Sequence, residues 1–159
     1  MDCGEDKWDY SVEYGHTVAC HPFRERQTEY IKQVIANAES EYAAEGVHTK
    51  LIISHVPFTF RDPDPMFGIE EDLYREWAAL FREHVKPDLM ICGHTHVLEL
   101  RQPGSMDDTY GQPCPIAISS QLSSGYYAGN GFVFSDGKAE IVSADSEGKT
   151  LAVQTVNYK

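Results

Sequence analysis

The chain has 159 residues, of which 42% are hydrophobic and 24% are charged, as in ordinary globular proteins. Its formal net charge of −12 disfavours non-specific binding to nucleic acid, whose phosphate backbone is also negative. A phosphorylated substrate is not excluded, because bound metal ions can reverse the local sign of the charge. No apolar run approaches the ~20 residues of a membrane helix, so we expect neither a membrane nor nucleic acid as a partner. At this length we expect one domain that spans residues 1–159.

The four cysteines do not indicate a disulfide framework. They form no C-x-x-C pair, and a chain of this length does not need such a framework. Cys92 lies in an apolar run and is expected to be a buried, reduced thiol. Cys3, His16, Cys20 and His21 could be read as a zinc site, but their spacing matches no standard structural pattern. Free thiols and hydrogen-bonded loop histidines are therefore the preferred interpretation.

Helices and strands alternate in the first two thirds of the chain. Apolar residues at three- and four-residue steps predict helices over 23–45 and over 73–84, the second ended by Pro87. Continuous apolar runs predict strands over 50–56 and 88–92 that are buried on both faces. The order helix, strand, helix, strand predicts an α/β layer arrangement.

The last third of the chain has the pattern of antiparallel strands. Alternation of apolar and polar residues begins at Val97, and Asp136-Gly137 is a strong two-residue hairpin signal. The expected strands cover residues 97–101, 115–119, 131–135, 138–144 and 150–156.

Three histidines stand where the two predicted buried strands end. His55 closes the first strand, and His94 and His96 follow the second within Gly93-His94-Thr95-His96. Ligands bind at the carboxyl ends of strands in open α/β sheets, and imidazole nitrogen suits transition metals. A lone histidine such as His55 is more often a hydrogen-bonded loop residue. The combination with Gly-His-x-His about forty residues later is much more specific.

The segments Ile52-Ile53-Ser54-His55-Val56-Pro57 and Met90-Ile91-Cys92-Gly93-His94-Thr95-His96 resemble the last two metal motifs of the calcineurin-like metallophosphoesterases, which include the purple acid phosphatases. The resemblance is strong over residues 51–97 and extends further only by the order of elements. It implies that the chain forms about half of a four-layer αββα sandwich.

The resemblance also implies roles for the three histidines. His55 and His94 would bind the second metal of a two-metal site, and His96 would bind the first. Manganese, iron and zinc all suit sites of this family. The implied reaction is the hydrolysis of a phosphate mono- or diester, and the implied partner is a phosphorylated small molecule or another phosphoester.

The family's earlier motifs do not occur in this chain. Asp-x-His, Gly-Asp-x-x-Asp and Asn-His are all absent, and with them the bridging carboxylate and the residue expected to protonate the leaving group. We therefore interpret the chain as the C-terminal portion of a phosphoesterase domain whose N-terminal portion would precede Met1. Without an anionic bridge between two divalent ions, at most one ion is expected here. No catalytic residue and no useful activity are expected of the chain alone.

Two alternatives remain open at this stage. The chain could be a stand-alone module that keeps the three histidines for a single metal and binds protein partners, or a structural domain whose histidine site is vestigial. Removal of half a sandwich would also leave a sheet exposed, so we expect self-association through it. The sequence leaves the cellular location open.

Two further groups of residues could contribute to a site. Tyr126 and Tyr127 could line a substrate pocket, although exposed loop aromatics are the simpler interpretation. A stretch of carboxylates suits a hard cation but lacks the spacing of an EF-hand, and we expect it to form an acidic loop over the site. The carboxylates of this stretch are Asp62, Asp64, Glu70, Glu71 and Asp72.

Overall fold

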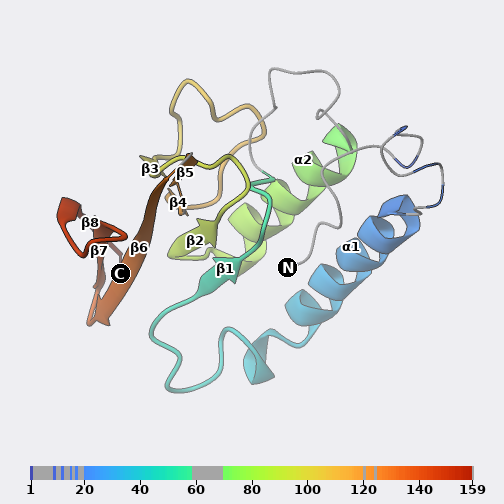
Figure 1. Cartoon of the computed structure of the whole chain (residues 1–159). Helices are drawn as coiled ribbons and strands as arrows, with labels where there is room; N and C mark the ends of the chain where they lie inside the picture. Colours follow the sequence, from blue (N-terminus) through green and yellow to red (C-terminus); the bar gives the residue numbers. More distant parts are fainter. Residues whose placement is uncertain are drawn as a thin grey trace.

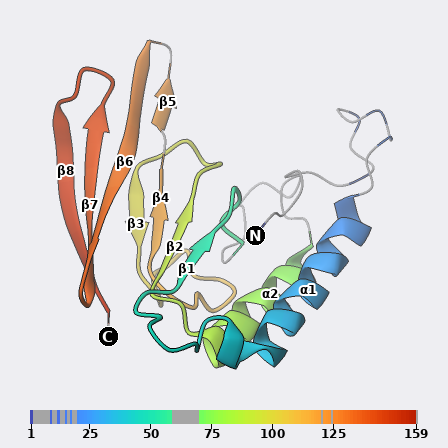
Figure 2. The ribbon, with the colours of Figure 1, turned by 90° about the horizontal axis from the view of Figure 1, so that it is seen from below.

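The computed structural model describes residues 1, 9, 12, 15, 17, 20–58, 70–119, 121–123 and 125–158. Within these residues the chain forms two α-helices and two four-stranded sheets, which confirms the predicted α/β class. The helices cover one face of the first sheet and the second sheet covers its other face (Figures 1 and 2). The described residues thus form three layers in the order helix, sheet, sheet.

The first sheet, sheet A, has the strand order β1-β2-β4-β3. Strands β1 (Leu51–Ile53), β2 (Leu89–Cys92) and β4 (Ile116–Ile118) are parallel, and β3 (Glu99–Arg101) runs antiparallel to β4. The carboxyl ends of three neighbouring strands, β1, β2 and β4, therefore lie at the same end of the sheet. The histidine motifs follow β1 and β2 at this end.

Alternate residues of sheet A belong to two different cores. Met90 and Cys92 of β2 pack toward helices α1 (Cys20–Ala36) and α2 (Glu71–Leu80), while Leu89 of the same strand packs toward the second sheet. The side-chain period of two in a strand produces this division. The helix-side core is rich in aromatic rings, namely Phe58, Tyr74, Trp77 and Phe81.

The second sheet, sheet B, is an antiparallel meander in the order β5-β6-β7-β8. Its strands are β5 (Gln121–Ser123), β6 (Tyr126–Ser135), β7 (Lys138–Asp145) and β8 (Thr150–Asn157). The predicted hairpin at Asp136-Gly137 is confirmed, since Ser135 pairs with Lys138 and Gly137 has a φ of 70°. Ala139, Ile141 and Val156 face sheet A and form the core between the two sheets.

The first helix differs from its predicted range of 23–45. It begins at Cys20, because the carboxylate of Asp9 accepts hydrogen bonds from the backbone N–H groups of Cys20 and His21, at 2.8 and 3.2 Å. It ends at Ala36, where the Asn37 side chain donates to the carbonyl of Gln33, and a short 3₁₀ turn (Ala38–Ser40) follows. The apolar stripe continues past this point because Tyr42 still packs against the helix-side core.

The second helix is closer to its predicted range of 73–84. It begins two residues earlier, at Glu71, and continues after Leu80 as a π-helical turn (Phe81–Val85). Lys86 then adopts a φ of 52° directly before Pro87, which ends the helix as predicted.

The strand predictions require two corrections. Strand β1 is not buried on both faces, because it lies at the edge of sheet A and sheet B does not cover it. Leu51 and Ile53 are 38% and 63% exposed, and only Ile52 is buried. The last third is also not wholly antiparallel, since β4 pairs in parallel with β2 and β5 was not predicted.

Candidate metal centre

The candidate site lies at the edge of sheet A where the parallel strands end. His55 follows β1 by two residues, and His94 follows β2 by two residues. Because β1 and β2 are hydrogen-bonded neighbours in parallel register, their following loops start side by side. This topology brings together two histidines that are far apart in the sequence.

Backbone hydrogen bonds join the loops that follow the three strands. The N–H of Gly93 donates to the carbonyl of His55 at 3.0 Å, and the N–H of Ser119 donates to the carbonyl of Cys92 at 2.7 Å. The buried Ser54 hydroxyl donates to the carbonyl of Val56 at 2.9 Å, which holds the loop on both sides of the exposed His55. The histidine loops are therefore continuous with the hydrogen bonding of the sheet.

The backbone at His94 adopts a conformation that is rare for residues with a Cβ atom. Its φ is 70°, and the N–H of Thr95 donates to the carbonyl of Gly93 at 2.8 Å, which closes a three-residue γ-turn around His94. His96 also has a positive φ, of 56°. Conformations of this kind cost on the order of 1–3 kcal/mol each and cluster at functional sites.

The imidazole rings of His55 and His94 form a close pair. Their centroids are 5.3 Å apart and their planes are inclined by 79°. Two imidazoles bound to one tetrahedral ion, with metal–nitrogen distances of ~2.0–2.1 Å, have ring centroids about 5 Å apart. The spacing thus fits a shared transition-metal ion, and it also suits a simple edge-to-face ring contact.

His96 does not complete a three-ligand group with this pair. Among the described residues, no three side chains of histidine, cysteine, aspartate or glutamate converge closely enough to hold a metal ion. His96 is exposed, whereas His94 is half-buried. The structure therefore brings together two of the three predicted ligands.

Two hydroxyl groups at this edge were not singled out by the sequence. Thr95 stands between His94 and His96 in the sequence, and Ser119 is the residue after β4. Their hydroxyl oxygens are buried without a hydrogen-bond partner in the described part of the chain. Buried hydroxyls without partners are uncommon, and two of the four found among the described residues belong to loops that follow strands of sheet A. Their only sequence signal is position, at or after a strand end.

The cysteines provide no nucleophile in the described ranges. Cys20, Cys92 and Cys114 are buried and form no disulfide in the described part of the chain, which confirms the expectation for Cys92. Burial raises the pKa of the Cys114 thiol to about 12, so this side chain stays protonated at neutral pH. Cys3, from the alternative zinc pattern, lies outside the described residues.

The described members of the alternative zinc pattern and of the acidic stretch have other roles. His21 Nδ1 contacts Glu70 Oε1 at 2.7 Å, and Arg24, which is fully buried, donates to the same oxygen at 3.2 Å. The hydrogen bond and the charge of Glu70 raise the pKa of His21. Glu71 forms an ion pair with Arg75 on its own helix. His16, Asp62 and Asp64 lie outside the described residues.

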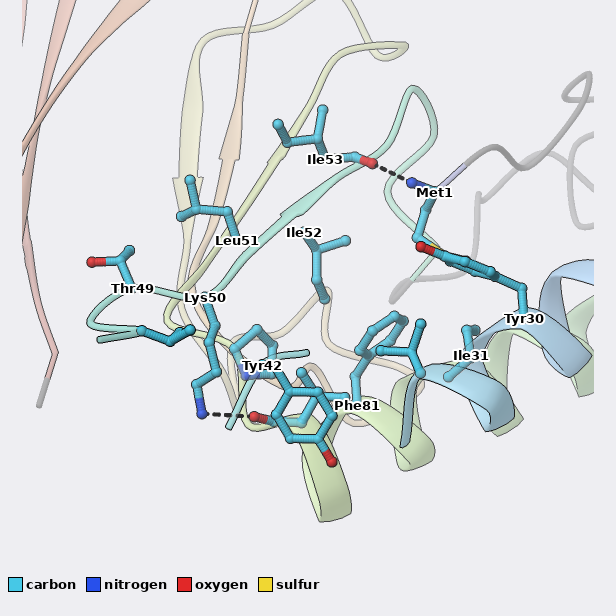
Figure 3. Close-up of a pocket in the computed structure, with 14 residues that line it drawn as sticks. Met1, Tyr30, Ile31, Tyr42, Thr49, Lys50, Leu51, Ile52, Ile53 and Phe81 are labelled. Carbon is cyan, nitrogen blue, oxygen red and sulfur yellow. Dashed lines mark hydrogen bonds between the residues drawn. The ribbon is translucent and has the colours of Figure 1, made fainter. Parts of the chain in front are cut away.

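One cavity lined by described residues lies away from the histidines. It has a volume of about 300 Å³ and lies between α1 and β1 (Figure 3). Its lining is largely apolar and includes Tyr30, Tyr42 and Ile52, and the amino group of Met1 donates to the carbonyl of Ile53 at its rim. It holds neither of the paired histidines, so it is distinct from the candidate metal centre.

Tyr126 and Tyr127 begin β6, at the turn of the β5–β6 hairpin. Tyr127 is 56% exposed and Tyr126 is half-buried. Because β4 leads directly into β5, this hairpin extends from the same edge of sheet A as the histidine loops, as Figure 2 shows. A role for these tyrosines in substrate binding stays a prediction.

The comparisons with known proteins add no family assignment. The chain matches no protein-family model and no curated protein. In the part of the chain that the structure describes, no helix has both the length and the apolar character needed to cross a membrane. The proposal below therefore rests on the motif residues and on their arrangement.

Proposed function

We propose that this chain carries the histidine half of a two-metal phosphoesterase centre. In this proposal it is the C-terminal portion of a calcineurin-like metallophosphoesterase domain, and the carboxylate ligands belong to a portion that precedes Met1. The observation that carries the proposal is the approach of His55 and His94, with ring centroids 5.3 Å apart, from loops that follow adjacent parallel strands.

Three features of the loops support this proposal. The γ-turn at His94 holds its imidazole beside that of His55, and the Gly93 N–H fixes the separation of the two loops. The third histidine of the motif, His96, is exposed and free to meet ligands from another segment. Among the described residues, no third histidine, cysteine or carboxylate side chain joins this ring pair into a group that could hold a metal ion.

Divalent ions in such a centre would polarise a phosphoryl oxygen and lower the pKa of a bound water. In such a centre, the residues of this chain would hold a metal ion and orient the groups around it. His55 and His94 would present imidazole nitrogens, and the buried hydroxyls of Thr95 and Ser119, in the loops that follow β2 and β4, would be available to orient a neighbouring polar group. The substrate class would be phosphate mono- or diesters.

Metal binding by the isolated chain tests the ligand set. Zinc and manganese would be titrated by calorimetry into wild type and into His55→Ala, His94→Ala and His96→Ala variants. His84→Ala is the matched control, because His84 is exposed and precedes β2, at the opposite end of the strand. We expect at most one ion per chain, lost in the His55 and His94 variants and retained in the control. Absence of binding in the wild type would refute a metal site in this chain.

Activity measurements separate the proposal from its alternative. We expect no metal-dependent hydrolysis of an aryl phosphate by this chain, and turnover by a longer chain that includes the Asp-x-His and Asn-His motifs. The alternative of a single-ion module is favoured to this extent: among the described residues, His55 and His94 are the two predicted ligands whose rings form a close pair. A longer chain that binds one ion and remains inactive would support that alternative.

A further inference from the structure

The four sheet edges of the described residues differ greatly in length. Strands β1, β3 and β5 lie at edges and have three residues each, whereas β8 is an edge strand of eight residues. Proteins protect exposed edges with short strands, charged residues, prolines or bulges. Only β8 is long enough to offer an extended template for another strand.

The composition of β8 leaves most of this edge unprotected. The strand reads Thr-Leu-Ala-Val-Gln-Thr-Val-Asn and contains no charged residue and no proline. A bulge interrupts its pairing with β7 near Ser143 and Ala144, so regular pairing extends from Ala152 to Asn157. Figure 2 shows β8 as the outermost strand, with no described segment beside it.

The ladder with β7 determines which backbone groups face the open edge. Tyr158 donates to the carbonyl of Gly137 directly opposite, which marks a hydrogen-bonded pair of the antiparallel ladder. Such pairs alternate with non-hydrogen-bonded pairs. Counting back along β8, the N–H and C=O groups of Val153, Thr155 and Asn157 point away from β7. These three residues present a regular set of donors and acceptors.

We propose that β8 pairs with β8 of a second copy of this chain, antiparallel and around a two-fold axis beside Thr155. In this register Thr155 lies opposite its own symmetry mate, and Val153 lies opposite Asn157. All three outward-facing residues then exchange both backbone hydrogen bonds with the other copy. The two copies of sheet B become one eight-stranded sheet, and the symmetry closes after two chains.

The net charge of −12 does not prevent the pairing of two copies at this edge. Glu140 on β7 pairs with Thr155 and carries the nearest carboxylate in the line of residues that crosses the strands at Thr155. In the dimer the two Glu140 residues are separated by three strand spacings, or about 14 Å, which exceeds the Debye length of ~10 Å. A basic partner, by contrast, would find no charge on β8 to recognise.

The outer face of sheet B carries exposed valines near the proposed interface, but polar residues meet at the interface itself. Val153 is 57% exposed and lies next to Val142 on β7, while Val133 on the same face of β6 is 58% exposed. In the proposed register Val153 lies opposite Asn157 of the other copy, which pairs with Lys138 on its own β7, so the valines of the two copies do not form a continuous apolar band. Strand pairing alone buries little area, so a weak dimer with a dissociation constant in the micromolar range or above is expected.

The experiment measures mass by sedimentation from about 1 µM to about 1 mM protein, the range of weak interfaces. The wild type should rise from the 17.9 kDa protomer mass toward twice that value, with or without a chelator. Thr155→Pro removes only an outward N–H and should remain monomeric, as should Val153→Lys. Val133→Lys is the matched control and should dimerise like the wild type, with circular dichroism confirming that each variant is folded.

Several results would overturn the proposal. A wild type that stays monomeric at every concentration has no such interface. If dimers persist in Thr155→Pro, they use another surface than the β8 edge. If Val133→Lys abolishes dimers as readily as Val153→Lys does, the dimers form by stacking of the outer faces of sheet B. Dimers that dissociate when metal is removed are held by the histidines rather than by β8.

Discussion

The backbone of His94 provides a quantitative test of the strain at the candidate metal centre. At a φ of 70°, a residue with a Cβ atom is strained by roughly 1–2 kcal/mol relative to glycine. His94→Ala removes the imidazole and keeps the strain, whereas His94→Gly removes both. The difference between the two variants therefore isolates the backbone contribution from any contact that the ring makes.

We expect His94→Gly to be more stable than His94→Ala by about 1–2 kcal/mol in metal-free buffer. For a chain of this length the difference corresponds to a melting temperature higher by roughly 2–8 °C. Urea unfolding followed by circular dichroism measures the free energy, and calorimetry measures the melting temperature. Both variants should lose metal binding equally.

His84 supplies the control, because it lies in a helical turn where glycine is unfavourable. There the order should be reversed, with His84→Gly less stable than His84→Ala by about 0.5–1 kcal/mol. Equal stabilities of the two His94 variants, with the reversed order intact at His84, would show that the turn at His94 stores no strain.

Two further predictions concern the helix layer. Trp77 Nε1 donates to Thr28 Oγ1 at 2.7 Å, and both side chains are buried. Thr28→Val should therefore lower the free energy of unfolding by about 1–3 kcal/mol, whereas Thr28→Ser should retain the bond. Urea unfolding measures this difference, and a valine variant as stable as the wild type would contradict the prediction. Because Glu70 raises the pKa of His21, their contact should stabilise the fold fully below pH ~6.5 and lose this effect as the pH rises through the raised pKa. A nuclear magnetic resonance titration of the His21 ring should show the raised pKa in the wild type and a lower one in Glu70→Gln, and unchanged values would contradict the assignment.

The sequence predicted where the candidate site lies better than it predicted which residues form the site. Apolar runs that end in histidine implied adjacent strand ends, and parallel pairing of β1 with β2 brings His55 and His94 together. The position of Ser119 could not be predicted, because it depends on the parallel pairing of β4 with β2. Strand direction is a property of the whole sheet and leaves little trace in a three-residue strand.

The limits of the helices show the same dependence on distant residues. Helix α1 begins at Cys20 because the carboxylate of Asp9, eleven residues earlier, accepts its first N–H groups. The exposure of Leu51 and Ile53 depends on how far sheet B extends over sheet A, which no local pattern records. Periodicity indicated the elements, and contacts between elements determined their ends.

The hydrogen bond from Gly93 to the carbonyl of His55 bears on the entropy of ligand binding. Because it links the two histidine loops through the backbone, the rings can separate only if this bond breaks or the loops deform. An ion that binds between them would therefore order little additional chain, and more of the intrinsic coordination free energy would appear as affinity. The same link ties the His55 loop to β2, so ion binding should slow amide hydrogen exchange at Gly93 together with that of its sheet.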